Sequence, residues 1–183
     1  MALKATIFKA DLQIADMDRN YYGDHSLTIA RHPSETDERM MVRLLAFALN
    51  ASDTLAFTKG ISSEDEPDIW QKDLTDTIEL WIEVGAPDEQ RIRKGCNRSR
   101  QVIVYHYGGR GSEVWWNQNA SKLERFDNLT VYHIPGEVSE QLAQLAQRTM
   151  RLQCTIQEGT VWLGDGERSV EVEMVVWKQH PLH

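Results

Sequence analysis

Cysteine is nearly absent from this sequence, in which Cys96 and Cys154 stand far apart and form no CxxC pair. Two such thiols are typical of a reducing compartment, so we expect no disulfide and a cytoplasmic protein. Long apolar runs are missing too. No stretch approaches the roughly 20 apolar residues that a membrane helix requires, and the N-terminus shows no signal peptide. We therefore expect no membrane partner.

Positive charge is also scarce, because 28 acidic residues face 20 lysines and arginines and leave a net charge of -8. This balance disfavours a protein that coats DNA nonspecifically, since phosphate binding depends on Lys and Arg. The balance differs locally, and nucleic acid stays a possible partner, while the sequence names no protein partner. Between residues 91 and 110 there is no acidic residue, and the basic residues there are Arg91, Arg93, Lys94, Arg98, Arg100 and Arg110.

No linker or internal repeat divides the 183 residues, of which 41% are hydrophobic, so we predict a single domain over residues 1–183. Hydrophobic periodicity and turn signals predict an α/β fold with a mixed sheet. The predicted order is a β-hairpin (2–30), a helix capped by Ser34 and ended by Asn50, strands (55–58, 67–71, 78–84), a helix (88–100), a strand (102–105), a helix (114–126), a strand (129–134), a helix (138–148) and an antiparallel β-meander (150–177). The predicted core contacts of the hairpin are Ile7, Leu12, Ile14, Leu27 and Ile29.

Two carboxylates of the predicted strands suit a metal site. Glu83 lies on the face of the 78–84 strand opposite Ile82, and Asp68 follows Pro67 on the preceding strand. Neighbouring strands lie about 4.8 Å apart, so the two carboxylates can hold one hard cation. Each residue also has a simpler interpretation, because Glu83 can be solvated on a half-exposed strand and Asp68 can serve a turn.

A third carboxylate, Glu38, precedes Met41, Val42 and Leu45 by three, four and seven residues, which places it on or beside the apolar face of its helix. An inward carboxylate needs a partner, because an unpaired buried charge is very unfavourable. The alternative is that Glu38 only interacts with the helix dipole.

The order helix, three strands, helix, strand over residues 34–107 resembles the αβββαβ core of PD-(D/E)XK nucleases, the restriction-endonuclease-like fold, with added antiparallel hairpins at both ends. A closer resemblance, to the bacterial YaeQ family, covers essentially the whole chain. That family is regarded as a variant of the same fold. The runs that carry this resemblance are Ala30–Thr36, Glu38–Leu49, Asp65–Asp68, Glu79–Gly85, Arg91–Lys94 and Val114–Trp116.

The resemblance implies roles for individual residues. Asp68 matches the first acid of the motif and Glu83 the second, while Glu38 matches a helix acid found in many members. Gly85 stands where the motif has its catalytic lysine. Lys94 and Arg91, on the following helix, are the candidates to supply that cation, although helical spacing favours a solvated face for both.

Two hypotheses follow. The first is a nuclease that hydrolyses DNA or RNA with Mg²⁺ or Mn²⁺ held by Asp68, Glu83 and Glu38, with Lys94 or Arg91 on the phosphate. The second is a catalytically inactive protein of the same fold that binds a protein or nucleic acid. Scattered histidines disfavour a zinc site, and the Trp115–Trp116 pair is interpreted as one core and one surface aromatic.

Overall fold

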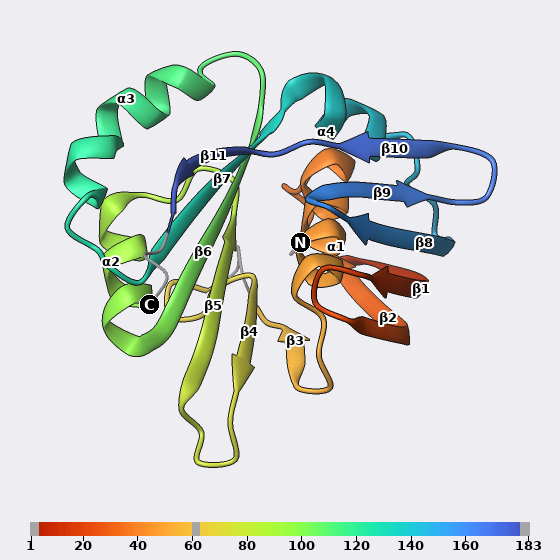
Figure 1. Cartoon of the computed structure of the whole chain (residues 1–183), viewed down its shortest axis with the longest axis horizontal. Helices are drawn as coiled ribbons and strands as arrows, with labels where there is room; N and C mark the ends of the chain where they lie inside the picture. Colours follow the sequence, from red (N-terminus) through yellow and green to blue (C-terminus); the bar gives the residue numbers. More distant parts are fainter. Residues whose placement is uncertain (1–3, 60–62, 180–183) are drawn as a thin grey trace. The chain divides into compact units, whose positions relative to one another are not determined.

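The computed structural model describes residues 4–59 and 63–179, so residues 2 and 3 of the predicted hairpin lie outside it. Within these ranges the chain forms eleven strands and four helices in the predicted order (Figure 1). They make a mixed α/β structure with two mixed sheets. None of the helices described is both long and apolar enough to cross a membrane. The chain divides into two compact units, while the prediction of one domain over 1–183 stays a prediction.

The first unit comprises Met1–Leu49 and Glu137–Glu173 and is built on a five-stranded sheet with the order β10-β9-β8-β1-β2. β8 pairs with β1 in parallel, and the other neighbours are antiparallel. The first two strands of the chain and the strands β8, β9 and β10 therefore share one sheet instead of forming separate hairpin additions. Its elements are β1 (Thr6–Asp16), β2 (Tyr21–Arg31), α1 (Asp37–Asn50), α4 (Gly136–Ala143), β8 (Thr149–Gln157), β9 (Thr160–Gly164) and β10 (Ser169–Val172).

The buried face of β1 follows the period of two from Phe8 to Asp16, which corrects one predicted core contact. Ile7 lies on the opposite face and is 45% exposed. Leu27 is only half-buried. The prediction was right for the remaining three contacts, which are buried: Leu12, Ile14 and Ile29.

The N-cap of helix α1, which begins at Asp37, lies two residues later than predicted. The side-chain oxygen of Thr36, not that of Ser34, accepts a hydrogen bond from the backbone N–H of Arg39 at 3.1 Å. The helix ends at Asn50 as predicted. Helix α4 is shorter than predicted, because the chain leaves helical structure after Ala143.

The second unit comprises Asn50–Gly136 and Met174–His183 and carries a six-stranded sheet with the order β11-β7-β6-β5-β4-β3. β5, β6 and β7 are parallel, as expected for strands joined by helical crossovers. β11 pairs with β7, so the predicted meander over 150–177 was wrong for its last strand. The elements are β3 (Leu55–Phe57), β4 (Ile69–Lys72), β5 (Ile78–Val84), α2 (Glu89–Arg98), β6 (Ser99–Gly108), α3 (Ser112–Leu123), β7 (Leu129–Pro135) and β11 (Val175–Lys178).

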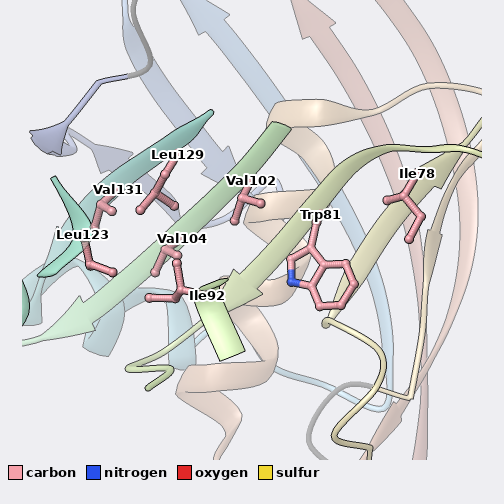
Figure 2. Packing of buried hydrophobic residues seen from close by; sticks show 8 residues of the cluster. All are labelled: Ile78, Trp81, Ile92, Val102, Val104, Leu123, Leu129 and Val131. Carbon is pink, nitrogen blue, oxygen red and sulfur yellow. The ribbon is translucent and has the colours of Figure 1, made fainter. Parts of the chain in front are cut away.

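The core of this second unit lies between the sheet and helices α2 and α3. Ile92 of α2 and Leu123 of α3 pack against apolar side chains of β5, β6 and β7 (Figure 2). All members of this cluster are buried: Ile78, Trp81, Ile92, Val102, Val104, Leu123, Leu129 and Val131. Trp81 of β5 lies at the same face, close beside Gly95 of α2, where a methyl group would approach the indole to 2.7 Å. Because α2 lies so close to β5 at Gly95, side chains from the first turn of α2 can reach residues of β5.

Candidate functional site

Asp68 and Glu83 face each other across β4 and β5. Ile69 pairs with Ile82 in an antiparallel register, which places the preceding Asp68 opposite the following Glu83. Side chains opposite one another in such a pair have Cβ atoms about 4.5–5.5 Å apart. Both residues are buried, at 1% and 2% exposure. The two acids predicted from the sequence are therefore brought together, and neither is solvated.

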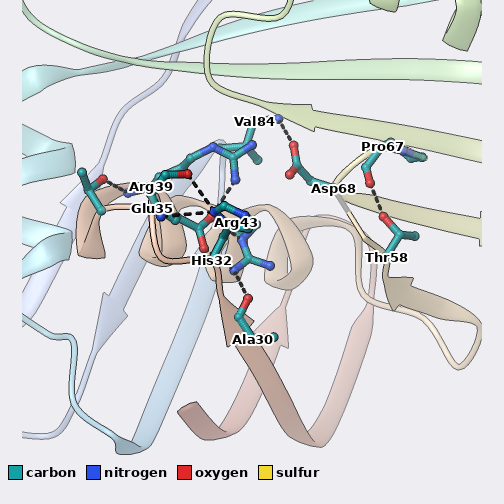
Figure 3. A network of polar contacts seen from close by, with 11 residues as sticks. Ala30, His32, Glu35, Arg39, Arg43, Thr58, Pro67, Asp68 and Val84 are labelled. Atoms are coloured by element: carbon teal, nitrogen blue, oxygen red, sulfur yellow. Dashed lines mark hydrogen bonds and ion pairs between the residues drawn. The ribbon is translucent and has the colours of Figure 1, made fainter. Parts of the chain in front are cut away.

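The carboxylate of Asp68 is fixed by the backbone of β5. Its Oδ2 accepts a hydrogen bond from the N–H of Val84 at 2.8 Å (Figure 3). Its own N–H donates to the carbonyl of Ile82 at 3.0 Å. Thr58 lies alongside, where its hydroxyl donates to the carbonyl of Pro67. Asp68 thus ends the short loop before β4 and belongs to the sheet, not to a solvated turn.

Both carboxylate oxygens of Glu83 are bound by protein donors. The indole N–H of Trp81 donates to Oε1 at 3.0 Å, and Nε of Arg91 donates to Oε2 at 2.7 Å. Burial first, and then the neighbouring charge of Asp68, raise the pKa of Glu83 from its ordinary value to about 7, whereas Arg91 and the indole act in the opposite direction. The two hydrogen bonds that Glu83 accepts therefore do not fully offset the effect of burying its charge beside Asp68.

Arg91 is not on a solvated face, which corrects the interpretation from helical spacing. Besides Glu83, its guanidinium donates to the carbonyl of Ser63 at 2.9 Å and to that of Glu66 at 2.5 Å. Its backbone N–H is held by Asp88, the N-cap of α2, at 2.8 Å. Four hydrogen bonds thus fix Arg91, and its side chain is only 22% exposed.

Lys94 does not reach the carboxylate pair. Its Nζ donates to the carbonyl of Glu64 at 3.1 Å and lies 3.4 Å from the carboxylate of Asp65, and its side chain is 39% exposed. Of the two candidate cations, only Arg91 contacts Glu83.

Gly85 has a backbone conformation that disfavours a lysine. It follows β5 with a φ of +104°, and its N–H donates to the carbonyl of Tyr105 at 2.9 Å. Residues with a Cβ rarely adopt this φ, because the Cβ clashes with the backbone. The backbone at position 85 therefore disfavours any side chain with a Cβ, lysine included.

Replacing Gly85 with lysine is expected to lower the free energy of unfolding by about 1–3 kcal/mol, because a side chain is forced into strained backbone. Urea denaturation measures this loss. Gly85→Ala is the matched control and should lose a similar amount, since the strain comes from the Cβ. A lysine variant as stable as the wild type would contradict the strain argument.

The donors of this pair, as placed, do not fit a resident divalent cation. Such a cation prefers six or more oxygen ligands, and each of its protein oxygens must turn a lone pair toward it. Here Glu83 gives its oxygens to Trp81 and Arg91, and Asp68 gives one to Val84. In the described ranges no group of three or more His, Cys, Asp or Glu side chains is arranged to hold a metal ion.

Glu38 lies in the first unit and its part in a common site stays a prediction. It is half-buried, and the buried carboxylate of this helix start is Glu35 instead. Arg43 donates to both oxygens of Glu35, at 2.6 and 2.8 Å, and Arg39 adds a bond at 2.6 Å (Figure 3). The inward acid that the sequence assigned to position 38 is thus at position 35.

A cluster of aromatic rings was missed in the sequence. His106 and His133 are paired across β6 and β7, with their Nδ1 atoms 3.1 Å apart, and Trp177 of β11 stacks on His133 at 4.4 Å. Trp115 and Trp116 join this stack and both are partly buried, so neither is a core residue. Burial, together with the neighbouring His133, lowers the pKa of His106 to about 4. Strand register, which the sequence did not reveal, brings the two histidines together.

The fold and the site define a mixed α/β protein with a buried Asp–Glu pair closed by an arginine. The chain belongs to the YaeQ family, whose family model, described as "YaeQ protein", matches residues 1–174.

The proteins named "Uncharacterized protein YaeQ" from Escherichia coli K12 and Salmonella typhi are each 48% identical over 179 residues, which cover 98% of this chain and 99% of theirs. The crystal structure of YaeQ protein from Xanthomonas axonopodis pv. citri matches with a TM-score of 0.92 and 51% identity, over 97% of this chain and 99% of that one. The YaeQ protein from Pseudomonas syringae matches with a TM-score of 0.91 and 37% identity, over 96% and 97%.

Proposed function

We propose that this chain is a restriction-endonuclease-like protein that binds nucleic acid and has lost metal-dependent hydrolysis. The order α1-β3-β4-β5-α2-β6 is the αβββαβ order typical of that fold, and it supports the assignment. The observation that carries the loss of hydrolysis is the ion pair between Arg91 and Glu83. It places a guanidinium on the carboxylate that a catalytic metal would use.

Nucleic acid is the proposed ligand because α2 and the start of β6 carry exposed arginines that make only long contacts with carboxylates. Arg93 and Arg100 are 47% and 69% exposed, and their nearest carboxylates, on Glu89 and Asp73, are 4.0 and 3.9 Å away. Contacts this long between exposed groups contribute little, and they leave the guanidinium groups able to bind phosphate. Because the chain as a whole is acidic, such binding would depend on the basic segment from Arg91 to Arg110, which contains no acidic residue.

Calorimetry with Mn²⁺ tests the loss of the metal site. The wild-type protein is expected to show no binding at micromolar concentrations, because both oxygens of Glu83 already accept hydrogen bonds and Arg91 places a positive charge beside them. Arg91→Gln should bind about one Mn²⁺ per chain, since it removes that charge and frees an oxygen of Glu83 opposite Asp68. Adding Asp68→Ala to Arg91→Gln should remove this binding, whereas adding Glu79→Ala, on the same strand face as Glu83, should not. Circular dichroism establishes that each variant is folded.

Hydrolysis of DNA or RNA is the second candidate function, and the opposed Asp68 and Glu83 favour it. The raised pKa of Glu83 indicates that its buried charge, beside that of Asp68, is not fully offset by the donors that it has, and a bound cation would offset it further. Stoichiometric Mn²⁺ binding by the wild type, lost in Asp68→Ala and in Glu83→Ala, would support this candidate and contradict the loss of hydrolysis.

A further inference from the structure

The segment Ser63–Glu66 lies on one face of α2 and is held there by three cations. Arg91 donates to the carbonyls of Ser63 and Glu66, and Lys94 donates to that of Glu64 at 3.1 Å. Arg98 donates to the carbonyl of Asp65 at 2.8 Å. Every residue of this four-residue segment thus gives its carbonyl oxygen to the helix.

These three cations have the spacing of a phosphate-binding helix face. Lys94 and Arg98 follow Arg91 by three and seven residues, so the three side chains lie along one side of α2 over about 10 Å. One strand of a duplex carries a phosphate about every 3.4 Å along its axis, so the face spans about three phosphates. A pocket of about 230 Å³ adjoins it and is lined by Glu64, Asp88, Gln90, Arg91 and Lys94.

The acceptors now on this face are mostly neutral carbonyls. The only side-chain carboxylate of the segment that reaches a cation is that of Asp65, at 3.4 Å from Lys94. A guanidinium group often binds a phosphate through two parallel hydrogen bonds, and the opposite charges add an attraction that a neutral carbonyl oxygen does not supply. A phosphate group that reached Arg98 or Lys94 would therefore make a stronger bond than the carbonyl it replaced.

The local structure of the segment Ser63–Glu66 favours its displacement from α2. The segment has no helical or strand structure, and Glu64 and Asp65 are exposed. Its three consecutive acids, Glu64, Asp65 and Glu66, put negative charge on the basic face that also repels a phosphate chain. The geometry points to Ser63–Glu66 as an internal competitor that covers a phosphodiester-binding face of α2 formed by Arg91, Lys94 and Arg98. This inference rests on the proposed nucleic-acid binding and adds its site and its regulation.

The first test measures binding of a short fluorescein-labelled oligonucleotide, as a single strand and as a duplex, by fluorescence polarisation at low and at physiological salt. The triple variant Glu64→Gln, Asp65→Asn, Glu66→Gln should bind about tenfold more tightly than the wild type. The matched control, Glu167→Gln, Glu171→Gln, Glu173→Gln, removes the same charge in the other unit and should change binding by less than about twofold. Arg98→Ala should weaken binding in both backgrounds.

The second test follows cleavage after Glu64 and Glu66 by a glutamate-specific protease. A displaced segment should be cut faster when the oligonucleotide is bound, whereas a segment that joins the interface should be protected. Equal affinity of the wild type, the triple variant and its control, or protection on binding, would overturn the competitor while leaving nucleic-acid binding intact. If no variant binds either oligonucleotide at low salt, the proposed function and this inference both fail.

Discussion

Replacing Arg91 with alanine is expected to lower the free energy of unfolding by about 3–5 kcal/mol at pH 8, the usual effect of removing one partner of a buried ion pair. The variant leaves Glu83 buried, opposite Asp68, with only the indole of Trp81 as a donor. It also removes the two bonds that hold the carbonyls of Ser63 and Glu66. Urea denaturation followed by tryptophan fluorescence and circular dichroism measures the loss.

The effect of Arg91→Ala should depend on pH because Glu83 titrates. Its pKa is raised to about 7 in the folded protein, so the stability conferred by the neutral carboxyl group is complete below its ordinary value of 4.5 and is lost as the pH rises through about 7. Near pH 5 the carboxyl group is protonated and needs a cation less. We therefore expect a smaller loss of stability at pH 5 than at pH 8.

Two controls separate charge from packing in this experiment. Arg91→Lys keeps a cation but cannot make the three side-chain bonds of the guanidinium, so it should recover only part of the loss. Combining Arg91→Ala with Glu83→Gln removes the unpaired charge and should also recover part of it. An equal loss at pH 5 and pH 8, with no recovery in the double variant, would show that the ion pair is not the cause.

Replacing Arg43 with alanine is expected to destabilise the first unit by a similar amount, about 3–5 kcal/mol. Arg43 lies in the middle of a helix stretch that is buried from Met40 to Ala48. Its guanidinium donates to both oxygens of Glu35 and to the carbonyl of Ala30 at 3.1 Å, which joins α1 to the end of β2. Alanine would leave a cavity and a buried carboxylate with one cation fewer.

Arg39 provides the matched control, because its Nη1 donates to the Oε2 atom of the same carboxylate at 2.6 Å from nearer the helix surface. Its side chain is 15% exposed, compared with 8% for Arg43. Arg39→Ala leaves the two-oxygen contact between Arg43 and Glu35 in place, so we expect a loss of about 1 kcal/mol. If Arg43→Ala and Arg39→Ala unfold at the same denaturant concentration, the role assigned to Arg43 is wrong.

Sequence patterns located the elements because their signals are local. The period of two over Ile78–Val84 and the helical spacing from Met41 to Leu49 predicted β5 and α1 closely. The same period placed Glu83 beside the preceding acid Asp68, and the register confirms that they face each other. Local patterns could not assign β8 or β11 to their sheets, because those strands pair with segments far away in the chain.

The sequence by itself determined the family, the order of the elements and the pair of opposed acids. The resemblance to the PD-(D/E)XK motif also predicted that Gly85 stands where that motif has its lysine, and this stays a prediction. Only the tertiary structure decided that Arg91 binds Glu83, because helical periodicity ignores how closely α2 approaches β5 at Gly95. It decided as well that the buried acid at the start of α1 is Glu35, two residues before the helix, since the guanidinium of Arg43, not hydrophobic spacing, sets which carboxylate is buried. Which partner a long side chain such as arginine contacts depends on how closely the elements pack in three dimensions, and local sequence patterns do not contain that information.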